Sequence, residues 1–160
     1  MPAASITLAF ADGEYVFRLG LAQIDEIERK CGAGIGAICA RLFKGRYKLN
    51  GQPLGLAAEA DFRVADLIEP IRQGLIGGGE GLVDGQPVKV GPPLANVLIE
   101  NYVIGCPLHD SWTLAAAVMM ALMEGYTPPK KAEPPVAAAP AANPRKKRGS
   151  TSPGPSSTAP

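Results

Sequence analysis

The stretch from Asp66 to Gly79 decides the fold, and it reads Asp-Leu-Ile-Glu-Pro-Ile-Arg-Gln-Gly-Leu-Ile-Gly-Gly-Gly. Its apolar residues recur at the three- and four-residue spacing of an amphipathic helix. The pattern predicts a central helix from about Glu59 to Ile76, which the three glycines at 77–79 then end. Because Pro70 lies inside this helix and removes one of its backbone hydrogen bonds, we expect a kink or a split into two helices.

The three glycines follow this helix rather than precede one. Phosphate-binding loops place their glycines before a helix, so that the N–H groups at its N-terminus face the anion. Neither Gly-Lys-Ser nor Gly-Lys-Thr comes after the three glycines. We therefore interpret them as a helix stop with a flexible joint, and not as a phosphate site.

The sequence before the central helix predicts one hairpin and two short helices. Residues 5–11 and 15–19 alternate apolar and polar side chains on either side of the turn dipeptide Asp12-Gly13, which is typical of a β-hairpin. Apolar residues then follow helical spacing at 21–31 and again at 35–44.

The remaining segments predict two loops and two further helices. Turn residues dominate 46–55 and 80–91, so both are expected to be loops, the second with a short extended piece at 88–90. A helix is expected from the two prolines at 92–93 to about Gly105, since proline fits the first turn of a helix. The last helix is expected between Pro107 and Gly125.

These elements define an α+β fold that is mostly α: an N-terminal β-hairpin followed by about five helices. Residues 3–126 hold all of them and are expected to form one helical domain. Residues 127–160 contain nine prolines, no aromatic residue and a single large apolar residue, Val136. Such a segment cannot bury enough apolar surface to offset the entropy of ordering it, so we predict a disordered tail.

Charge is divided unevenly between these two parts. The tail carries six basic residues against one acidic residue, and the rest of the chain carries ten against 14, which leaves them at +5 and −4. An acidic body argues against specific binding of nucleic acid. The basic run at 145–148 resembles a localisation or nucleic-acid patch, but a solubilising or partner-binding tail explains it equally well.

Cysteines and apolar segments indicate a soluble protein of the cytoplasm. Cys31, Cys39 and Cys106 form no Cys-x-x-Cys pair, so they predict buried thiols rather than disulfides or a zinc site. The N-terminus lacks the basic region of a secretory signal. The most apolar run, 112–123, is too short to cross a hydrocarbon core of about 30 Å.

One cluster of reactive residues lies between the last two predicted helices: Cys106, His109, Asp110 and Ser111. His109 is the only histidine, so any imidazole chemistry would depend on it. Catalytic groups usually come together from distant segments, and Asp110 or Ser111 as a helix cap explains the same residues. We therefore predict no catalytic residue, no metal ligand and no cofactor.

The last predicted helix carries a soft apolar strip formed by Trp112, Met119, Met120 and Met123. Core packing explains it, and so does an exposed partner-binding surface, because methionine-rich surfaces adapt to varied apolar helices. These four residues are the candidate partner-binding site.

With its parts in this order, the chain resembles the small tail proteins of gene transfer agents and siphophage-like prophages, a family labelled tail tube and also grouped with tail assembly chaperones. The resemblance covers about residues 4–126, and its most specific piece is the Gly-Leu-Ile-Gly-Gly sequence at 74–78. It also includes the stretches Gly13-Glu14-Tyr15-Val16-Phe17-Arg18-Leu19, Gly34-Ile35-Gly36-Ala37-Ile38 and Asp66-Leu67-Ile68.

The resemblance implies a non-enzymatic role in tail assembly inside the bacterial host, with association with the virion left open. Proteins of this kind are thought to coat the long helical tape-measure protein until tube subunits replace them. The expected partners are therefore the tape-measure protein, the major tail tube protein and a second copy of this chain. No binding to a membrane is expected.

A structural component of the finished tail, either tube or connector, is the alternative role. A tube subunit needs a large β-sheet for a continuous wall. The single hairpin predicted here favours the chaperone over the tube.

Overall fold

The computed structural model describes residues 3–44, 46–49, 52–56 and 60–129, and its folded unit spans Met1–Pro128. The fold is α+β and mostly helical, as predicted. The strands are β1 (Ser5–Phe10), β2 (Gly13–Arg18), β3 (Arg46–Leu49), β4 (Gln52–Leu56), β5 (Glu80–Val83) and β6 (Gln86–Lys89). The helices are α1 (Leu21–Cys31), α2 (Ile35–Lys44), α3 (Val64–Gly78), α4 (Pro92–Tyr102) and α5 (Leu108–Glu124). Residues 130–160, most of the predicted tail, lie outside the described residues.

The N-terminal hairpin is confirmed, with its turn one residue earlier than the sequence suggested. β1 and β2 pair antiparallel from Ser5 opposite Arg18 to Phe10 opposite Gly13. Ala11 and Asp12 therefore form the two-residue turn, and Ala11 adopts a φ of 55°. Gly13 belongs to the strand instead.

The prediction of a loop at 80–91 was wrong, because β5 and β6 form a second hairpin there. Only the extended piece expected at 88–90 overlaps a strand, β6. Its turn residues Asp84 and Gly85 both have positive φ, as the tight turn that matches strand twist requires. β5 also pairs with β2, which gives a four-stranded antiparallel sheet in the order β1-β2-β5-β6.

The prediction of a loop at 46–55 was also wrong. β3 and β4 pair antiparallel as a separate two-stranded sheet, with an irregularity in register between Tyr47 and Lys48. Asn-Gly is the strongest short-range signal for a hairpin, and this dipeptide stands at 50–51.

The central helix α3 is continuous through Pro70, so the expected split was wrong. It also begins five residues later than expected. The backbone N–H of Arg63, in extended conformation, donates to Asp66 Oδ2 at 2.8 Å, and this contact caps the first turn. Gly79 ends the helix in the left-handed conformation, with φ of 72°.

Gly77 and Gly78 do not stop the helix but allow it to touch the sheet. A Cβ atom at Gly77 would lie 2.1 Å from the carbonyl oxygen of Arg18, and one at Gly78 would lie 1.8 Å from that of Val16. Such distances are far below contact, so only glycine lets the helix backbone approach β2 this closely. The flexible joint was therefore a wrong interpretation, because β5 follows directly after Gly79.

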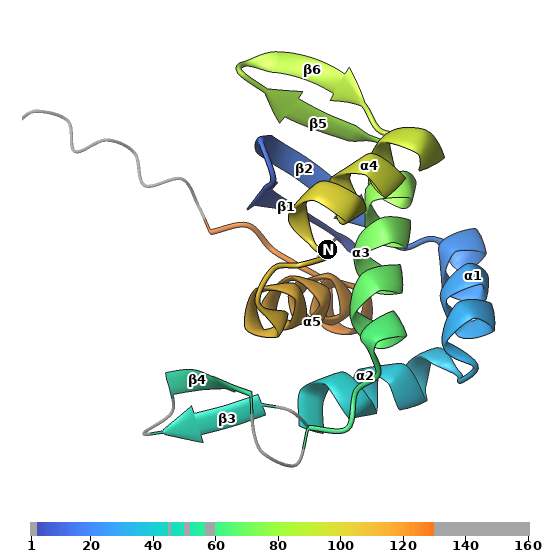
Figure 1. The fold of residues 1–160 in the computed structure, drawn as a ribbon, viewed down its shortest axis with the longest axis vertical. Coiled ribbons are helices and arrows are strands. Elements are labelled where there is room, and N and C mark those ends of the chain that lie inside the picture. The colour runs from blue at the N-terminus through green and yellow to red at the C-terminus, as the bar shows by residue number, and fades with distance from the viewer. Residues whose placement is uncertain (1–2, 45, 50–51, 57–59, 130–160) are drawn as a thin grey trace, which may run out of the picture. The chain divides into compact units, whose positions relative to one another are not determined.

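Figure 1 shows α3 at the centre of the folded unit, where it packs against β2, α1, α4 and α5. The inner face of β2 contributes Tyr15 and Phe17 to the core. The largest fully buried apolar side chains of the helices are Ile27, Ile38, Leu42, Leu67, Ile71, Leu75, Ile99 and Met119. Every helix therefore contributes to one hydrophobic core around α3.

A buried ion pair joins α2 to the start of α3. Arg41 donates from Nε and Nη2 to the two carboxylate oxygens of Asp66, at 2.8 and 2.7 Å. Asp66 is fully buried, and its Oδ2 also accepts the N–H of Arg63. The carboxylate thus caps α3 and neutralises a cation of α2, which compensates its removal from water.

Candidate functional site

The four residues of the predicted Met strip do not share one surface. Trp112 is buried, and its Nε1–H donates to the carbonyl oxygen of Leu42 at 2.9 Å. Met119 is fully buried, Met120 is half-buried, and only Met123 is mainly exposed, at 55%. The hypothesis that all four residues form one exposed groove was therefore wrong, because Trp112 and Met119 pack into the core. Contact of Met120 and Met123 with a partner stays a prediction.

This division predicts different stabilities for variants along α5. Trp112→Phe should lower the free energy of unfolding by about 1–3 kcal/mol, because it leaves the buried carbonyl of Leu42 without its donor. Met119→Ala should cost about 2–5 kcal/mol through the cavity it creates. Met123→Ala, the matched control, should stay within about 0.5 kcal/mol. Urea unfolding followed by circular dichroism measures all three, and equal losses at positions 119 and 123 would contradict the assignment.

The reactive cluster between α4 and α5 is spread over two recesses. Cys106 is exposed and lines a pocket with Ile104 and Leu108, whereas His109 and Asp110 line a groove beside β1. Among the described residues, no hydrogen bond joins the thiol, the imidazole and the carboxylate. Cys106, His109 and Asp110 therefore do not form a hydrogen-bonded pair of nucleophile and base.

Helix α5 begins one turn earlier than a cap at Asp110 or Ser111 would require. Pro107 precedes its first residue, and the N–H of Asp110 donates to the carbonyl oxygen of Pro107 at 3.0 Å. The prediction that either side chain caps the helix was wrong. Asp110 lies within the first turn, where a carboxylate suits the positive end of the helix dipole.

Cys31 and Cys39 are buried thiols, as predicted, but the prediction was wrong for Cys106, which is exposed. Burial raises the pKa of Cys31 to about 12, and the nearby carboxylate of Asp66 adds to the shift. Burial also raises the pKa of Cys39. Both thiols therefore stay protonated and unreactive at neutral pH. Within the described ranges, no group of three or more His, Cys, Asp or Glu residues could hold a metal ion.

Alkaline pH should destabilise the fold through two buried groups. Burial, and to a smaller extent the hydrogen bond to Asp12, raise the pKa of Tyr15 from 10.0 to about 12. Burial likewise raises the pKa of Cys31 from 9.0 to about 12. The folded state favours both neutral forms, so their stabilisation is complete below pH 9 and is lost as pH rises towards 12. The free energy of unfolding should fall by about 1.4 kcal/mol per pH unit for each group.

Urea unfolding between pH 8 and pH 11.5 measures this fall. Tyr15→Phe should remove the part that begins at pH 10 and leave the part that begins at pH 9. A Tyr15→Phe chain with the same slope as the unaltered chain above pH 10 would refute the assignment to the phenol.

Exposed apolar side chains gather at the start of α3 and at the connection between α4 and α5. Val64, Ile104 and Leu108 are each more than half exposed, and all three line one pocket of about 150 Å³. We call this the loop pocket; Leu67, Ile68, Val103, Gly105, Cys106 and Ser111 complete its lining. Apolar surface left exposed around a recess is typical of a contact site for another protein.

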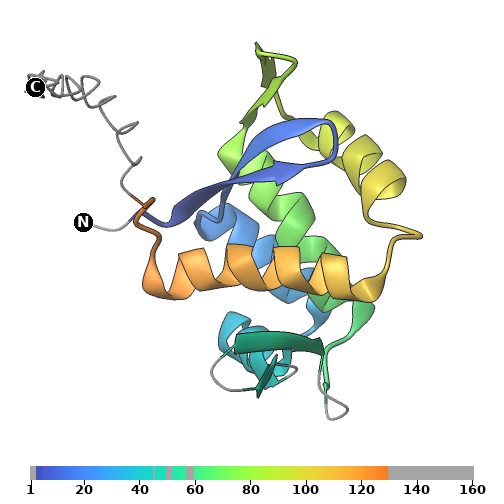
Figure 2. The ribbon, with the colours of Figure 1, turned by 90° about the vertical axis from the view of Figure 1, so that its left-hand side faces the viewer.

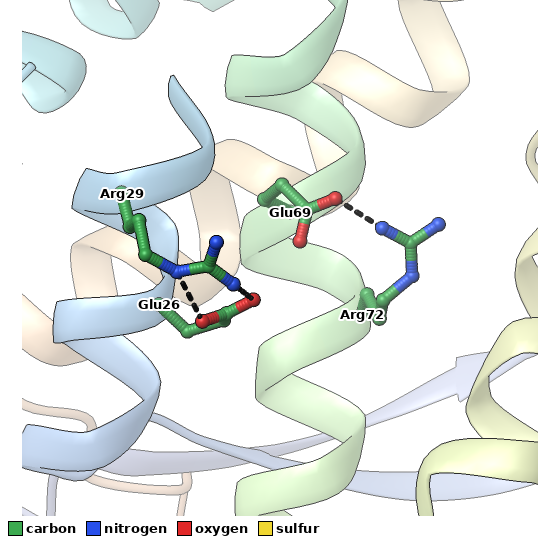
Figure 3. Close-up of polar contacts among 4 residues, drawn as sticks. All are labelled: Glu26, Arg29, Glu69 and Arg72. Carbon is green, nitrogen blue, oxygen red and sulfur yellow. Dashed lines mark hydrogen bonds and ion pairs between the residues drawn. The ribbon is translucent and has the colours of Figure 1, made fainter. Parts of the chain in front are cut away.

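A second recess, of about 590 Å³, lies between α1, α3 and α4 and is lined by charged residues. Figure 3 shows two ion pairs there, Glu26 with Arg29 on α1 and Glu69 with Arg72 on α3. Glu69 is buried, yet its Oε2 and the Nε of Arg72 have no hydrogen-bond partner among the described residues. This buried ion pair therefore leaves one carboxylate oxygen and one guanidinium nitrogen without a hydrogen bond among the described residues, which is unusual for buried polar atoms.

A third recess lies beside strand β1. Figure 2 shows α5 running alongside the β1–β2 hairpin, with the α4–α5 connection at one end of the space between them. The groove has a volume of about 500 Å³ and is lined on one side by residues 8–11 and on the other by α5 from His109 to Ala117. Tyr102 of α4 and the residue after it, Val103, lie at its end. We call it the edge groove, because β1 is the outer strand of the sheet.

Comparison with known proteins gives one family. A family model described as "Phage tail tube protein, GTA-gp10" matches residues 3–51. No curated protein and no solved structure gives a significant match to the chain. Over this N-terminal segment, which contains β1, β2, α1, α2 and β3, the chain is similar to this phage tail tube family, and the resemblance inferred from the sequence is confirmed. The Gly-Leu-Ile-Gly-Gly stretch, taken above as its most specific piece, lies outside the match.

None of the helices among the described residues is long and apolar enough to cross a membrane.

The residues that shape the three recesses were mostly missed from the sequence. Val64, Ile104 and Leu108 are ordinary aliphatic residues near helix ends, and no sequence signal separates them from core residues such as Leu67. The Asp-Gly dipeptide at 84–85 was a usable signal for the second hairpin, since this dipeptide suits a tight two-residue turn.

Proposed function

We propose that this chain is a non-enzymatic phage-tail assembly protein that binds the tape-measure protein while the tail is built. The similarity of residues 3–51 to a phage tail tube family supports a role in the tail. The absence of a joined nucleophile and base among the described residues of the α4–α5 cluster agrees with a binding role.

The observation that carries the proposal is the loop pocket with its three exposed aliphatic side chains, Val64, Ile104 and Leu108. A dry cavity of about 150 Å³ is large enough to hold a benzene-sized group, so the pocket fits one apolar anchor side chain. An amphipathic helix presents such anchors at three- and four-residue spacing, as an apolar stripe of a long helical protein does. Covering each aliphatic side chain of the rim contributes about 1.5–3 kcal/mol before the costs of ordering the partner.

Co-purification of the tape-measure protein encoded in the same gene cluster tests this role. The full chain, expressed with an affinity tag in cells that build tails, should retain the tape-measure protein. A Val64→Asp, Leu108→Asp double variant should retain at least tenfold less, because two charges would have to be buried at the contact. Leu21→Asp is the matched control, since Leu21 is 83% exposed on α1 and lies outside the loop pocket. Equal capture by both variants would refute the site, and no capture by the unaltered chain would refute the partner.

The second candidate role, a structural component of the finished tail, gains support from the fold. The argument against it rested on a single hairpin, whereas the described residues contain a four-stranded antiparallel sheet and a separate two-stranded one. The description of the matching family, a tail tube protein, fits this role at least as well.

Quantitative mass spectrometry of purified particles separates the two roles. A chaperone should be absent from finished particles or present in trace amounts. A number of copies comparable to that of the major tube protein would overturn the chaperone role and establish the structural one.

A further inference from the structure

The outer edge of β1 carries a row of backbone groups that point away from the sheet. Ala3 marks the direction of the row: its N–H donates to the carbonyl oxygen of Tyr126 at 3.1 Å, and the N–H of Tyr126 donates to the carbonyl oxygen of Ala3 at 2.8 Å. Residues two apart in a strand direct their backbone groups to the same side. Ser5, Thr7 and Ala9 therefore continue the row that Ala3 begins.

The turn of the hairpin gives the same direction independently. Phe10 and Gly13 flank the two-residue turn, so they form the hydrogen-bonded pair that closes it. Hydrogen-bonded and non-hydrogen-bonded pairs alternate along an antiparallel ladder. Leu8 and Ile6 then bond to β2, and Thr7 and Ala9 turn their N–H and C=O groups outward.

Tyr126 forms hydrogen bonds only with Ala3, the first residue of this row. Among the described residues, the outward backbone groups of Ser5, Thr7 and Ala9 have no hydrogen-bond partner. Unpaired edges of this kind pair readily with another strand. The opposite edge of the sheet, β6, contains Pro87 and Lys89, which are residue types that discourage such pairing.

The edge groove supplies room for a strand and a surface for its side chains. Leu8 and Phe10 point to the inner side of the sheet but are only half-buried. Leu114 and Ala117 face them across the groove from α5, and the volume between is about 500 Å³. A strand beside β1 would place every second side chain against these apolar residues.

Two features favour a single extended segment over a second copy of the whole sheet. Tyr126 already lies beside Ala3 at one end of the edge, and α5 lies along the edge on the side of the groove. A second sheet would have to continue through these residues, whereas one short strand needs only the part of the edge that borders the edge groove. β1 itself carries no charged residue, and among the described residues Asp110 is the one carboxylate that lines the groove, so an uncharged segment matches most of this surface.

We propose that the edge of β1 is a binding site for one extended segment of a partner protein, uncharged and apolar at every second residue, which adds to the sheet as a strand. The site rests on the unpaired edge of β1 and on the edge groove beside it, and it does not depend on whether the chain acts as a tail chaperone or as a tail component.

Amide hydrogen exchange of the full chain tests the site residue by residue. The probe is a capped peptide of sequence Ser-Ile-Thr-Leu-Ala-Phe with two lysines at each end, which copies the alternation of β1. In the free chain, the amides of Thr7 and Ala9 should exchange fast, and those of Leu8 and Phe10 should be protected. Saturating peptide should slow Thr7 and Ala9 by roughly tenfold or more. A peptide with proline in place of its Thr and Ala should have no such effect.

Two results would overturn the site. The first is exchange at Thr7 and Ala9 that the peptide does not slow. The second is protection already present in the free chain, which would mean that the chain itself covers the edge, or that a second copy does if the protection grows with protein concentration.

Variants test the same contact from both sides of the groove. Ala9→Pro removes an outward N–H that the fold does not use and should abolish peptide binding, whereas Ala9→Ser keeps the N–H and should bind normally. Ala117→Trp should fill the groove from α5 and also abolish binding without altering β1. Unchanged peptide affinity in the folded Ala117→Trp chain would refute the groove.

Discussion

Replacing Gly78 by alanine is expected to lower the free energy of unfolding by at least about 3 kcal/mol, or to prevent folding altogether. The added Cβ would lie 1.8 Å from the carbonyl oxygen of Val16 and 2.5 Å from its carbon. Both atoms are backbone of a central strand, so no rotation of a side chain can relieve the overlap. Either α3 or β2 must move, and the movement would disturb the core packed on both.

Gly36 is the matched control, because it lies inside a helix with open space around its Cα. Apart from the adjacent residues and the backbone of its own helix, no atom of the described residues lies within 4 Å of a Cβ built there. Gly36→Ala should therefore raise stability by up to about 1 kcal/mol through its helix propensity.

Urea unfolding followed by circular dichroism measures the free energy of unfolding of both variants. Two glycine-to-alanine changes of opposite sign are expected within one protein. A Gly78→Ala chain as stable as the unaltered one would show that α3 does not lie against β2 as described.

Replacing Asp66 by asparagine is expected to lower the free energy of unfolding by about 3–5 kcal/mol. The change keeps the shape of the side chain but removes the charge that the guanidinium of Arg41 faces at 2.7 and 2.8 Å. It also places an NH₂ group where one carboxylate oxygen now accepts a hydrogen bond. A partly buried cation would be left without its anion, and the cost of that isolation exceeds the value of the pair itself.

The exposed pair of Glu26 and Arg29 on α1 is the control for this effect. Arg29 Nε donates to Glu26 Oε2 at 3.0 Å, but Arg29 is largely exposed to solvent. Glu26→Gln should cost much less than Asp66→Asn, because water and salt screen exposed charges. Equal losses for Asp66→Asn and Glu26→Gln would contradict the buried role of Asp66.

The ends of most helices were predictable because local chemistry sets them. Leu21–Cys31 and Ile35–Lys44 match the predicted ranges, and α5 stops at Gly125 as expected. The start of α3 was not predictable, since the Arg63–Asp66 contact that caps it competes with apolar spacing that continues further upstream. The second hairpin was missed because its strands have only four residues each, too few for a clear period.

The candidate site was less predictable than the fold. Helical spacing places Trp112 and Met119 on one face of α5, but it does not say whether that face meets solvent or α2 and α3. The open edge of β1 and the exposed rim at Val64, Ile104 and Leu108 depend on which elements fail to cover them, and that is a property of the assembled chain.

The sequence by itself determined the hairpin, the helical periods and the similarity to tail proteins, because each depends on residues close together along the chain. Only the tertiary structure decided the meaning of the glycines at 77–79. As a local pattern they indicate the end of a helix, and Gly79 alone does this, through its positive φ. Gly77 and Gly78 are glycine because the carbonyl groups of Arg18 and Val16, some sixty residues earlier, occupy the space that side chains would need.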